Sequence, residues 1–177
     1  MIIHLVESTA TGTLSMVRLG ANSQAAAGYD VQVIYSAREE TPADLDSLFH
    51  PAVKLINLQM GTLKEKILSL FTIRRIVAEN VPQAVFMHSS FAGFLGRLAL
   101  LGKEVKCFYL PHCISFMRQD ISPVKRILFT ALEWAGAIKS ATYVACSESE
   151  GQAIKKHIPF RPCVVVENAV NVDAWNH

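Results

Sequence analysis

Short apolar runs alternate with longer segments of helical periodicity along almost the whole chain, and this alternation limits the folds open to it. The runs are rich in Val, Ile, Phe and Tyr and apolar at successive positions, as expected of strands buried on both faces of a parallel sheet. We predict strands at Ile2–Val6, Asp30–Tyr35, Val53–Leu58, Ala84–Met87, Val105–Leu110, Thr142–Cys146 and Cys163–Val166. Strand alternates with helix six times, without an internal repeat or a Gly/Ser linker. The pattern predicts an α/β fold: one doubly wound, mostly parallel, Rossmann-like sheet of about seven strands with helices on both faces.

The segments between the strands carry helix signals. We predict helices over 14–28, 63–79, 91–101 and 124–140, a short one after Ser147, and a short helical turn within the polar loop 36–52. Ser122 is a candidate N-cap with Pro123 at the first helical position. The apolar positions of that helix are expected to be buried; they are Ile127, Leu128, Ala131, Leu132 and Ala135.

Composition supports one large core and excludes several kinds of partner. Of the 177 residues, 51% are hydrophobic and 18% charged, which favours one well-buried domain over disorder. A net charge of +2, with no dense basic stretch among aromatic residues, argues against a nucleic-acid partner. No apolar run reaches the roughly 18–20 residues that a membrane span needs. The first residues lack a basic segment and reach Glu7 early, so we interpret them as a strand and not as a signal peptide.

The four cysteines form no C-x-x-C pair. They are Cys107, Cys113, Cys146 and Cys163, and most lie in or beside apolar runs. A zinc site is therefore disfavoured, and we predict no metal. Buried free thiols in a reducing cytoplasm explain the pattern.

Polar segments follow the ends of most predicted strands. Because the carboxyl ends of parallel strands lie at one edge of a sheet, these segments should form a single rim, where ligands of open α/β sheets bind. They are Thr9–Thr13, Ser36–Glu40, His88–Ser90, His112–Ser115, Ser147–Glu150 and Asn168–Asn171. Pro111 ends the strand before His112, and an imidazole at that position can donate, accept or take up a proton near neutral pH. The alternative is a loop histidine without a chemical role.

The turn after the first strand contains one glycine, whereas the dinucleotide fingerprint needs three. A Walker lysine motif is absent as well, so NAD, FAD and ATP-loop functions are disfavoured and we predict no cofactor. Backbone N–H groups at Gly12 and Thr13, at the start of a helix, can accept a phosphate or a carboxylate. An ordinary strand-to-helix turn is the alternative.

The other rim residues also have purely structural interpretations. His88 reads as a loop residue beside Ser89 and Ser90, and Asn168 as a left-handed turn former. Glu150 suits the first turn of the short helix that follows Ser147.

Three pairs of segments nevertheless form a recognisable set. Thr11-Gly12-Thr13 opens a helix that is followed by Ala26–Ile34. The second pair is Val85–Gly93 and Phe108–His112, and the third is Ala141–Glu150 and Val164–Asn171.

This set resembles the N-terminal half of the GT-B glycosyltransferases, in the large retaining family four of bacterial glycan and lipopolysaccharide enzymes. The three pairs are similar to that family's "Gly-Gly … Leu-x-x-x-Gly-His-x-Val-x-Val" opening, to its "His-x-His … aromatic-x-x-His-Gly" strands, and to its "Ala-Asp-x-Val-x-x-x-Ser" and "Val-x-x-Asn-Gly-Val-Asp" signatures. The resemblance covers essentially the whole chain. Thr11, Cys113 and Ala169 stand where the family has glycine.

The resemblance implies a hexosyltransferase-type enzyme of polysaccharide biosynthesis. Such an enzyme moves a sugar from a nucleotide-sugar donor to a glycan or lipid-linked acceptor with retention of configuration. It would hold the donor mainly in a C-terminal Rossmann-like domain, which we do not expect within residues 1–177. We therefore expect residues 1–177 to be a single acceptor-side domain with little or no turnover of its own.

The resemblance also assigns roles to rim residues. His112 would be the catalytic residue, beside the donor sugar, where it hydrogen-bonds a hydroxyl and orients the reacting centre. Gly12 and Thr13 would bring backbone amides to the donor diphosphate or the acceptor. The remaining substrate-binding candidates are His88, Ser89 and Ser90, toward the acceptor, and Asn168. The family needs no metal at this site.

Two further matters stay open at the level of sequence. A mixed basic and apolar segment near the predicted cleft suggests peripheral contact with an anionic bilayer at the inner face of the cell membrane, where a lipid-linked acceptor would lie. It comprises Phe116, Met117, Arg118, Pro123, Lys125, Arg126, Ile127 and Phe129. A partly buried helix with a solvated basic face is the alternative. The alternatives to a transferase are a nucleotide-sugar 2-epimerase-like domain and a non-catalytic α/β binding module.

Overall fold

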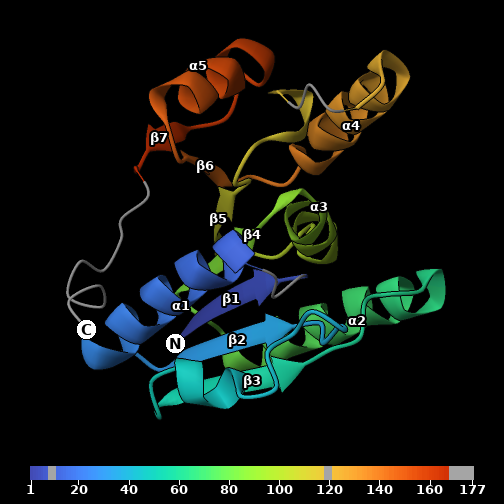
Figure 1. Cartoon of the computed structure of the whole chain (residues 1–177). Coiled ribbons are helices and arrows are strands. Elements are labelled where there is room, and N and C mark those ends of the chain that lie inside the picture. Colours follow the sequence, from blue (N-terminus) through green and yellow to red (C-terminus); the bar gives the residue numbers. More distant parts are fainter. Residues whose placement is uncertain (8–10, 118–120, 168–177) are drawn as a thin grey trace.

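The chain folds around one sheet of seven parallel strands, in the order β3-β2-β1-β4-β5-β6-β7 (Figure 1). This computed structural model describes residues 1–7, 11–117 and 121–167. The strands are β1 Ile2–Val6, β2 Val31–Tyr35, β3 Val53–Asn57, β4 Ala84–His88, β5 Lys106–Leu110, β6 Thr142–Ala145 and β7 Cys163–Val165. The predicted doubly wound parallel sheet is confirmed, and its strands begin and end within about one residue of the predicted bounds, because apolar runs of this kind are set locally.

The helices and short turns alternate with the strands as predicted. They are α1 Thr11–Ala26, η1 Leu45–Leu48, α2 Leu63–Asn80, α3 Ser90–Ala99, η2 Ser115–Met117, α4 Pro123–Gly136 and α5 Glu148–His157. Before α2, the hydroxyl of Thr62 accepts from the N–H of Glu65, and the carboxylate of Glu65 accepts from the N–H of Thr62. This capping box fixes where the helix begins. Helix α1 begins earlier than predicted, so Gly12 and Thr13 lie in its first turn.

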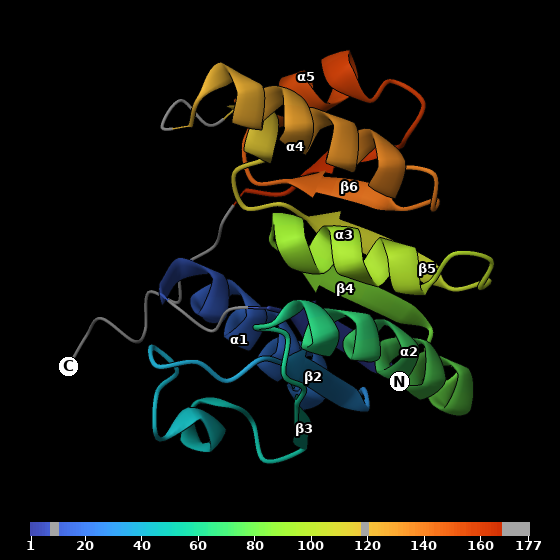
Figure 2. The same ribbon diagram turned by 90° about the vertical axis from the view of Figure 1, so that its right-hand side faces the viewer.

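Each face of the sheet has its own helices (Figure 2). Leu5 and Met87 point toward the layer of α2, α3 and α4, where Leu95 packs on them. Val6 points to the opposite face and packs with Val17 of α1. The chain runs outward from β1 through β2 to β3 and then returns to place β4 on the other side of β1. That reversal puts a crevice at the carboxyl ends of β1 and β4, where open α/β sheets bind ligands.

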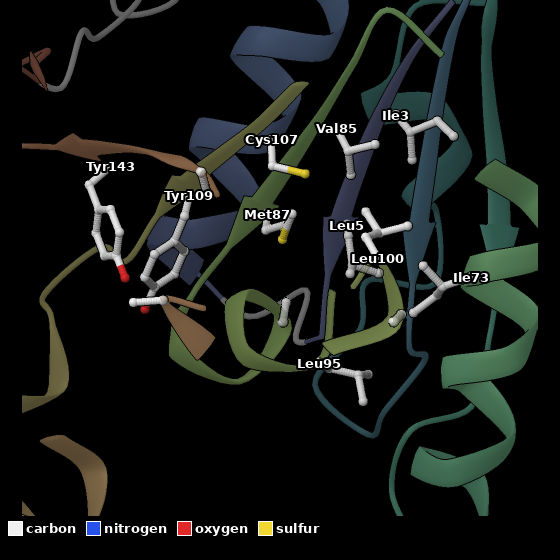
Figure 3. Close-up of a cluster of buried hydrophobic side chains, with 14 of the residues drawn as sticks. Ile3, Leu5, Ile73, Val85, Met87, Leu95, Leu100, Cys107, Tyr109 and Tyr143 are labelled. Carbon is white, nitrogen blue, oxygen red and sulfur yellow. The ribbon is translucent and has the colours of Figure 1, made fainter. Parts of the chain in front are cut away.

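Helix α3 lies close on the sheet because two of its positions are glycine. A Cβ on Gly93 would lie 2.1 Å from Cε2 of Tyr109, and one on Gly96 would lie 2.7 Å from Sδ of Met87. Glycine at both positions therefore allows this close approach. Tyr109 lies beside Tyr143 at one end of the core, with their rings edge to face (Figure 3).

The expected burial of the apolar side chains of α4 is wrong. Glu133 and Gly136 are the buried residues of this helix, whereas its apolar stripe faces outward. The exposed members include Val124, Ile127, Leu128, Leu132 and Trp134. Helical periodicity identifies an apolar stripe but not what covers it, and α4 meets α3 through its small and charged positions instead.

Candidate functional site

The carboxyl ends of β4 and β5 bring two predicted rim segments together. The N–H of Ser89 donates to the carbonyl of Leu110 at 2.9 Å, which extends the pairing of the two strands by one residue. A pocket of about 630 Å³ opens beside this junction, between the loop after β5 and the helices α3 and α4. Its lining residues are Glu7, Ser89, Ser90, Phe91, Phe94, Pro111, His112, Cys113, Phe129, Leu132 and Glu133.

Backbone strain is concentrated at this pocket. Four described residues other than glycine have a positive φ, and three of them line it: Ser89 at 76°, His112 at 53° and Cys113 at 90°. The fourth, Val81, is the left-handed C-cap of α2. Each such conformation costs of order 1–3 kcal/mol and persists where its surroundings hold it in place, commonly at functional sites. The strain therefore singles out the rim at β4 and β5 within the described chain.

Glu150 holds the strained loop after β5. One of its carboxylate oxygens accepts from the N–H groups of Cys113 and Ile114, at 3.0 and 2.7 Å, and the other from the N–H of Cys146 at 2.8 Å. The side chain is 2% exposed. Ser147 caps α5 by accepting from the N–H of Glu150 at 3.2 Å. One buried carboxylate thus joins the loop after β5, the end of β6 and the first turn of α5.

A row of three imidazoles leads from the pocket into the core. Nε2 of His112 lies 3.1 Å from Nδ1 of His88, and Nε2 of His88 lies 2.9 Å from Nδ1 of His4. Nε2 of His4 lies 2.8 Å from Oε1 of Gln24 on α1. The planes of neighbouring rings are nearly parallel, at 22° and 11°, and their centroids lie 5.2 and 5.4 Å apart, as expected of imidazoles joined edge to edge. His4 and His88 are each 2% exposed, so of the three rings that of His112 faces the pocket.

All three imidazoles are biased toward the neutral form. Burial lowers the pKa of His4 to about 4, against a small opposing effect of the hydrogen bond to Gln24. Burial lowers the pKa of His88 well below its usual range, and repulsion from His4 and His112 adds to this. Burial also lowers the pKa of His112, while the negative charge of Glu150 opposes the shift. At neutral pH His112 therefore presents an uncharged ring.

A second buried polar cluster lies behind Glu133, which is one of the residues that line the pocket. Nη2 of Arg97 donates to Oε2 of Glu133 at 2.8 Å, and Nη1 donates to the hydroxyl of Tyr143 at 2.6 Å. The hydroxyl of Tyr109 donates to Oε1 of Glu133 at 2.6 Å, and Nε of Arg97 donates to the carbonyl of Gly93 at 2.8 Å. Burial, the largest single effect, lowers the pKa of Arg97, but the charge of Glu133, its hydrogen bond and the influence of Tyr109 and Tyr143 together outweigh burial, so the pKa is raised. The cluster joins α3, α4 and the sheet around one ion pair.

The structure brings some of the predicted site residues together and separates others. Ser89, Ser90 and His112 line the same pocket, and the hydroxyl of Ser89 is buried without a hydrogen-bond partner. His88 lies behind His112 with both ring nitrogens engaged inside the protein, at the end of β4 and not in a loop.

The remaining candidates lie elsewhere. Gly12 and Thr13 open α1 and are not part of the pocket lining; a Cβ on Gly12 would meet nothing within 4 Å. Asn168 lies outside the described residues.

Sequence reasoning missed the partners of these residues. His4 stands alone among the apolar residues of β1, and a polar residue in a buried strand was the available signal. Glu150 was assigned only to a helix start, since its contacts with Cys113 and Ile114 come from a segment 36 residues or more away. Arg97 and Glu133 interrupt apolar helix patterns, which was a signal for a buried pair.

The described part of the chain contains no cluster of metal-ligating side chains, and its cysteines are free thiols. No group of three or more His, Cys, Asp or Glu side chains there could hold a metal ion. The four cysteines are free, but the expectation that they are buried holds only for Cys107; Cys113 is exposed, and Cys146 and Cys163 are half-buried. Within the described residues, no helix is long and apolar enough to cross a membrane.

Solved structures share this fold. Sucrose-phosphate synthase from Thermosynechococcus elongatus aligns with a TM-score of 0.78 at 14% identity, over 97% of this chain and 49% of the synthase. The apo form of the lipopolysaccharide outer core galactosyltransferase WaaB aligns with a TM-score of 0.67 at 13% identity, over 97% of this chain and 47% of the galactosyltransferase. UDP-N-acetylglucosamine 2-epimerase from Rickettsia bellii aligns with a TM-score of 0.65 at 11% identity, over 94% of this chain and 44% of the epimerase. The fold is that of the N-terminal domain of GT-B glycosyltransferases.

Sequence comparison narrows the class to one family. The profile of Glycosyltransferase Family 4 matches residues 12–174, and the chain belongs to that family. An uncharacterized 41.2 kDa protein in the cps region of Klebsiella pneumoniae is 28% identical over 97% of this chain and 47% of its own length. The chain thus spans about half the length of the curated relative it matches.

Proposed function

We propose that this chain is the acceptor-side domain of a hexosyltransferase that moves a sugar from a nucleotide-sugar to a glycan or lipid-linked acceptor, with retention, in polysaccharide biosynthesis. Membership of Glycosyltransferase Family 4 supports the reaction class. The relative's greater length supports a second domain that would hold most of the donor. Without that domain we expect little or no turnover.

One observation carries the proposal to named residues. His112 projects a neutral imidazole into the rim pocket from a strained loop that Glu150 fixes in place. A neutral imidazole can hydrogen-bond a sugar hydroxyl without competing for a proton, and a preorganised group costs no reorganisation during the reaction. The apolar wall formed by Phe91, Phe94 and Phe129 would pack against the acceptor. Ser89 and Ser90, which line the same pocket, would lie against its polar part.

The test uses the full-length protein that contains this chain. We expect His112→Ala to lower kcat by about 10²-fold, as typical of lost positioning and electrostatic stabilisation, while the melting temperature stays close to that of the wild type. The readout is nucleoside diphosphate release from UDP- and GDP-hexoses with lipid-linked and glycan acceptors. His50→Ala is the matched control, since His50 is exposed and precedes β3. Undiminished turnover in His112→Ala would overturn the assigned role.

Two binding and turnover measurements separate the alternatives. For the chain alone, we expect acceptor to bind more tightly than nucleotide-sugar; the reverse order would contradict the acceptor-side assignment. Conversion of UDP-N-acetylglucosamine to its 2-epimer without an acceptor would instead identify an epimerase. If the full-length protein shows neither turnover nor sugar binding, a non-catalytic binding module is the remaining alternative.

The outer stripe of α4 supports peripheral contact with an anionic membrane. Val124, Ile127 and Leu128 are 76%, 71% and 55% exposed, and they lie at helical spacing on α4. Lys125 and Arg126 flank the stripe and would attract anionic headgroups. Phe129 and Leu132 connect the same helix to the pocket, so a chain docked there could receive a lipid-linked acceptor at the inner face of the membrane.

The membrane segment suggested by the sequence lies only partly at the surface, because Met117 packs against the core and Arg126 and Phe129 are half-buried. Phe116 is 8% exposed and packs in the core, so it cannot enter a bilayer, and Arg118 lies outside the described residues. Pro123, Lys125 and Ile127 remain at the surface.

Vesicle flotation tests the proposed membrane contact. We expect the chain to float with phosphatidylglycerol-containing vesicles and not with pure phosphatidylcholine vesicles. The double variant Ile127→Ser, Leu128→Ser is expected to stay at the bottom of the gradient. Leu63→Ser with Phe71→Ser is the matched control, because these two residues are at least about as exposed as Ile127 and Leu128 but lie on α2. If neither the wild type nor the control variant floats with the vesicles, the membrane proposal is wrong. The proposed transferase function is not affected by that result.

A further inference from the structure

The imidazole row ends at the side-chain amide of Gln24, whose oxygen and not its NH2 group faces His4. Gln24 presents its amide oxygen, an obligate acceptor, to Nε2 of His4 at 2.8 Å. His4 must therefore carry its proton on Nε2. A neutral imidazole has one N–H, so Nδ1 of His4 is then an acceptor.

The same reasoning passes along the row. Nε2 of His88 must donate to Nδ1 of His4 across 2.9 Å, which leaves Nδ1 of His88 as an acceptor. Nε2 of His112 must then donate to Nδ1 of His88 across 3.1 Å. The remaining nitrogen of His112, Nδ1, is left with a lone pair. One amide on α1 thus determines the hydrogen-bonding character of a ring in the pocket.

We propose that Gln24 and His4 are positioning residues that set the tautomer of His112, so that its Nδ1 accepts a hydrogen bond from a ligand hydroxyl. His88 transmits the setting between them. Only the ligand part of this inference rests on the proposed function; the tautomer follows from the hydrogen bonds within the chain. Stacking of His4 on Phe86, with centroids 5.1 Å apart, helps hold the plane of its ring.

The row sets an orientation and does not conduct protons. An amide oxygen does not take up a proton near neutral pH, so a proton arriving at His112 has no exit at the other end. Both inner rings are buried, which disfavours a charge on either. Among the described charged groups, it is the carboxylate of Glu150 whose charge acts on the pKa of His112, which it raises. The row therefore fixes one neutral tautomer.

Nitrogen-15 NMR of histidine-labelled chain tests this directly. We expect the wild-type spectrum at pH 7.5 to show His112 protonated at Nε2 and unprotonated at Nδ1. Gln24→Glu keeps an acceptor but adds a charge that favours protonation of His4, so it should leave that signature unchanged at a pH at which the nitrogen-15 shifts show His4 to be neutral. Gln24→Leu removes the acceptor and should give His112 a mixture of both tautomers, and His4→Phe should do the same while keeping the stacked ring. Gln24 is half-buried on α1, so Gln24→Leu remains informative if His4→Phe does not fold.

A kinetic measurement on the full-length protein connects the tautomer to the reaction. We expect Gln24→Leu to lower kcat roughly tenfold with a smaller change in KM, and Gln24→Glu to restore it, since the loss is that of one hydrogen-bond preference. Protonation of His112 at Nδ1 in the wild type, or the same single tautomer in Gln24→Leu, would overturn the proposal. If the NMR signatures are as expected but His112→Ala keeps full turnover, the proposed function fails and the tautomer assignment stands.

Discussion

Replacing Glu133 by alanine is expected to lower the free energy of unfolding by about 3–5 kcal/mol, the usual cost of leaving one partner of a buried ion pair uncompensated. Arg97 would keep its charge at 0% exposure, and the hydroxyl of Tyr109 would lose its acceptor. Urea denaturation of the chain, followed by circular dichroism, measures the change. Glu79→Ala is the control, because Glu79 is exposed on α2 and its pair with Arg75 is a surface pair worth little.

A double variant separates loss of charge balance from loss of packing. Arg97→Met with Glu133→Leu removes both charges and fills much of the same space, so we expect it to be more stable than Glu133→Ala. Tyr109 and Tyr143 would still lack their partners, which limits the recovery. A cost below about 1 kcal/mol for Glu133→Ala would mean that water reaches Arg97, and would contradict the buried pair.

Replacing Glu150 by alanine is expected to cost about 3 kcal/mol, since three backbone N–H groups lose a charged acceptor at once. The positive φ of His112 and Cys113 would also lose the contact that maintains it. In the full-length protein, kcat should therefore fall with stability, and the distinct amide signals of Cys113 and Ile114 should broaden or move in NMR spectra.

Glu148→Ala is the matched control for Glu150. Both residues lie in the first turn of α5, but Glu148 is exposed and makes none of the three bonds. Its loss should cost a few tenths of a kcal/mol through the helix dipole alone. Equal effects of the two substitutions would show that Glu150 acts as a helix-start carboxylate and not as the anchor of the loop after β5.

The sheet and its helices could be predicted from the sequence because their signals are local. Apolar runs identified the strands, and the capping residues Thr62, Ser122 and Ser147 each precede a helix. The crevice followed from topology, since parallel strands place their carboxyl ends along one edge. This topology alone is enough to predict that His112 lies beside a pocket.

The interactions that shape the site could not be predicted in the same way. The contacts of Glu150 with the loop after β5, and of Gln24 with His4, join segments whose distance depends on the finished packing of the helices. The prediction that the apolar stripe of α4 is buried was wrong for a related reason, because amphipathicity does not reveal which face of a helix meets the core. Local rules fix the elements, whereas pairs of polar residues fix the site.

The central place of β1 has a consequence for how this chain emerges from the ribosome. One side of β1 pairs with β2 soon after synthesis, but its other side pairs with β4, where Ile2 meets Ala84. At roughly 5–20 residues per second, that second side waits about 4–16 s for its neighbour. During this interval an unpaired Ile- and Leu-rich edge is open to chaperones and to other nascent copies.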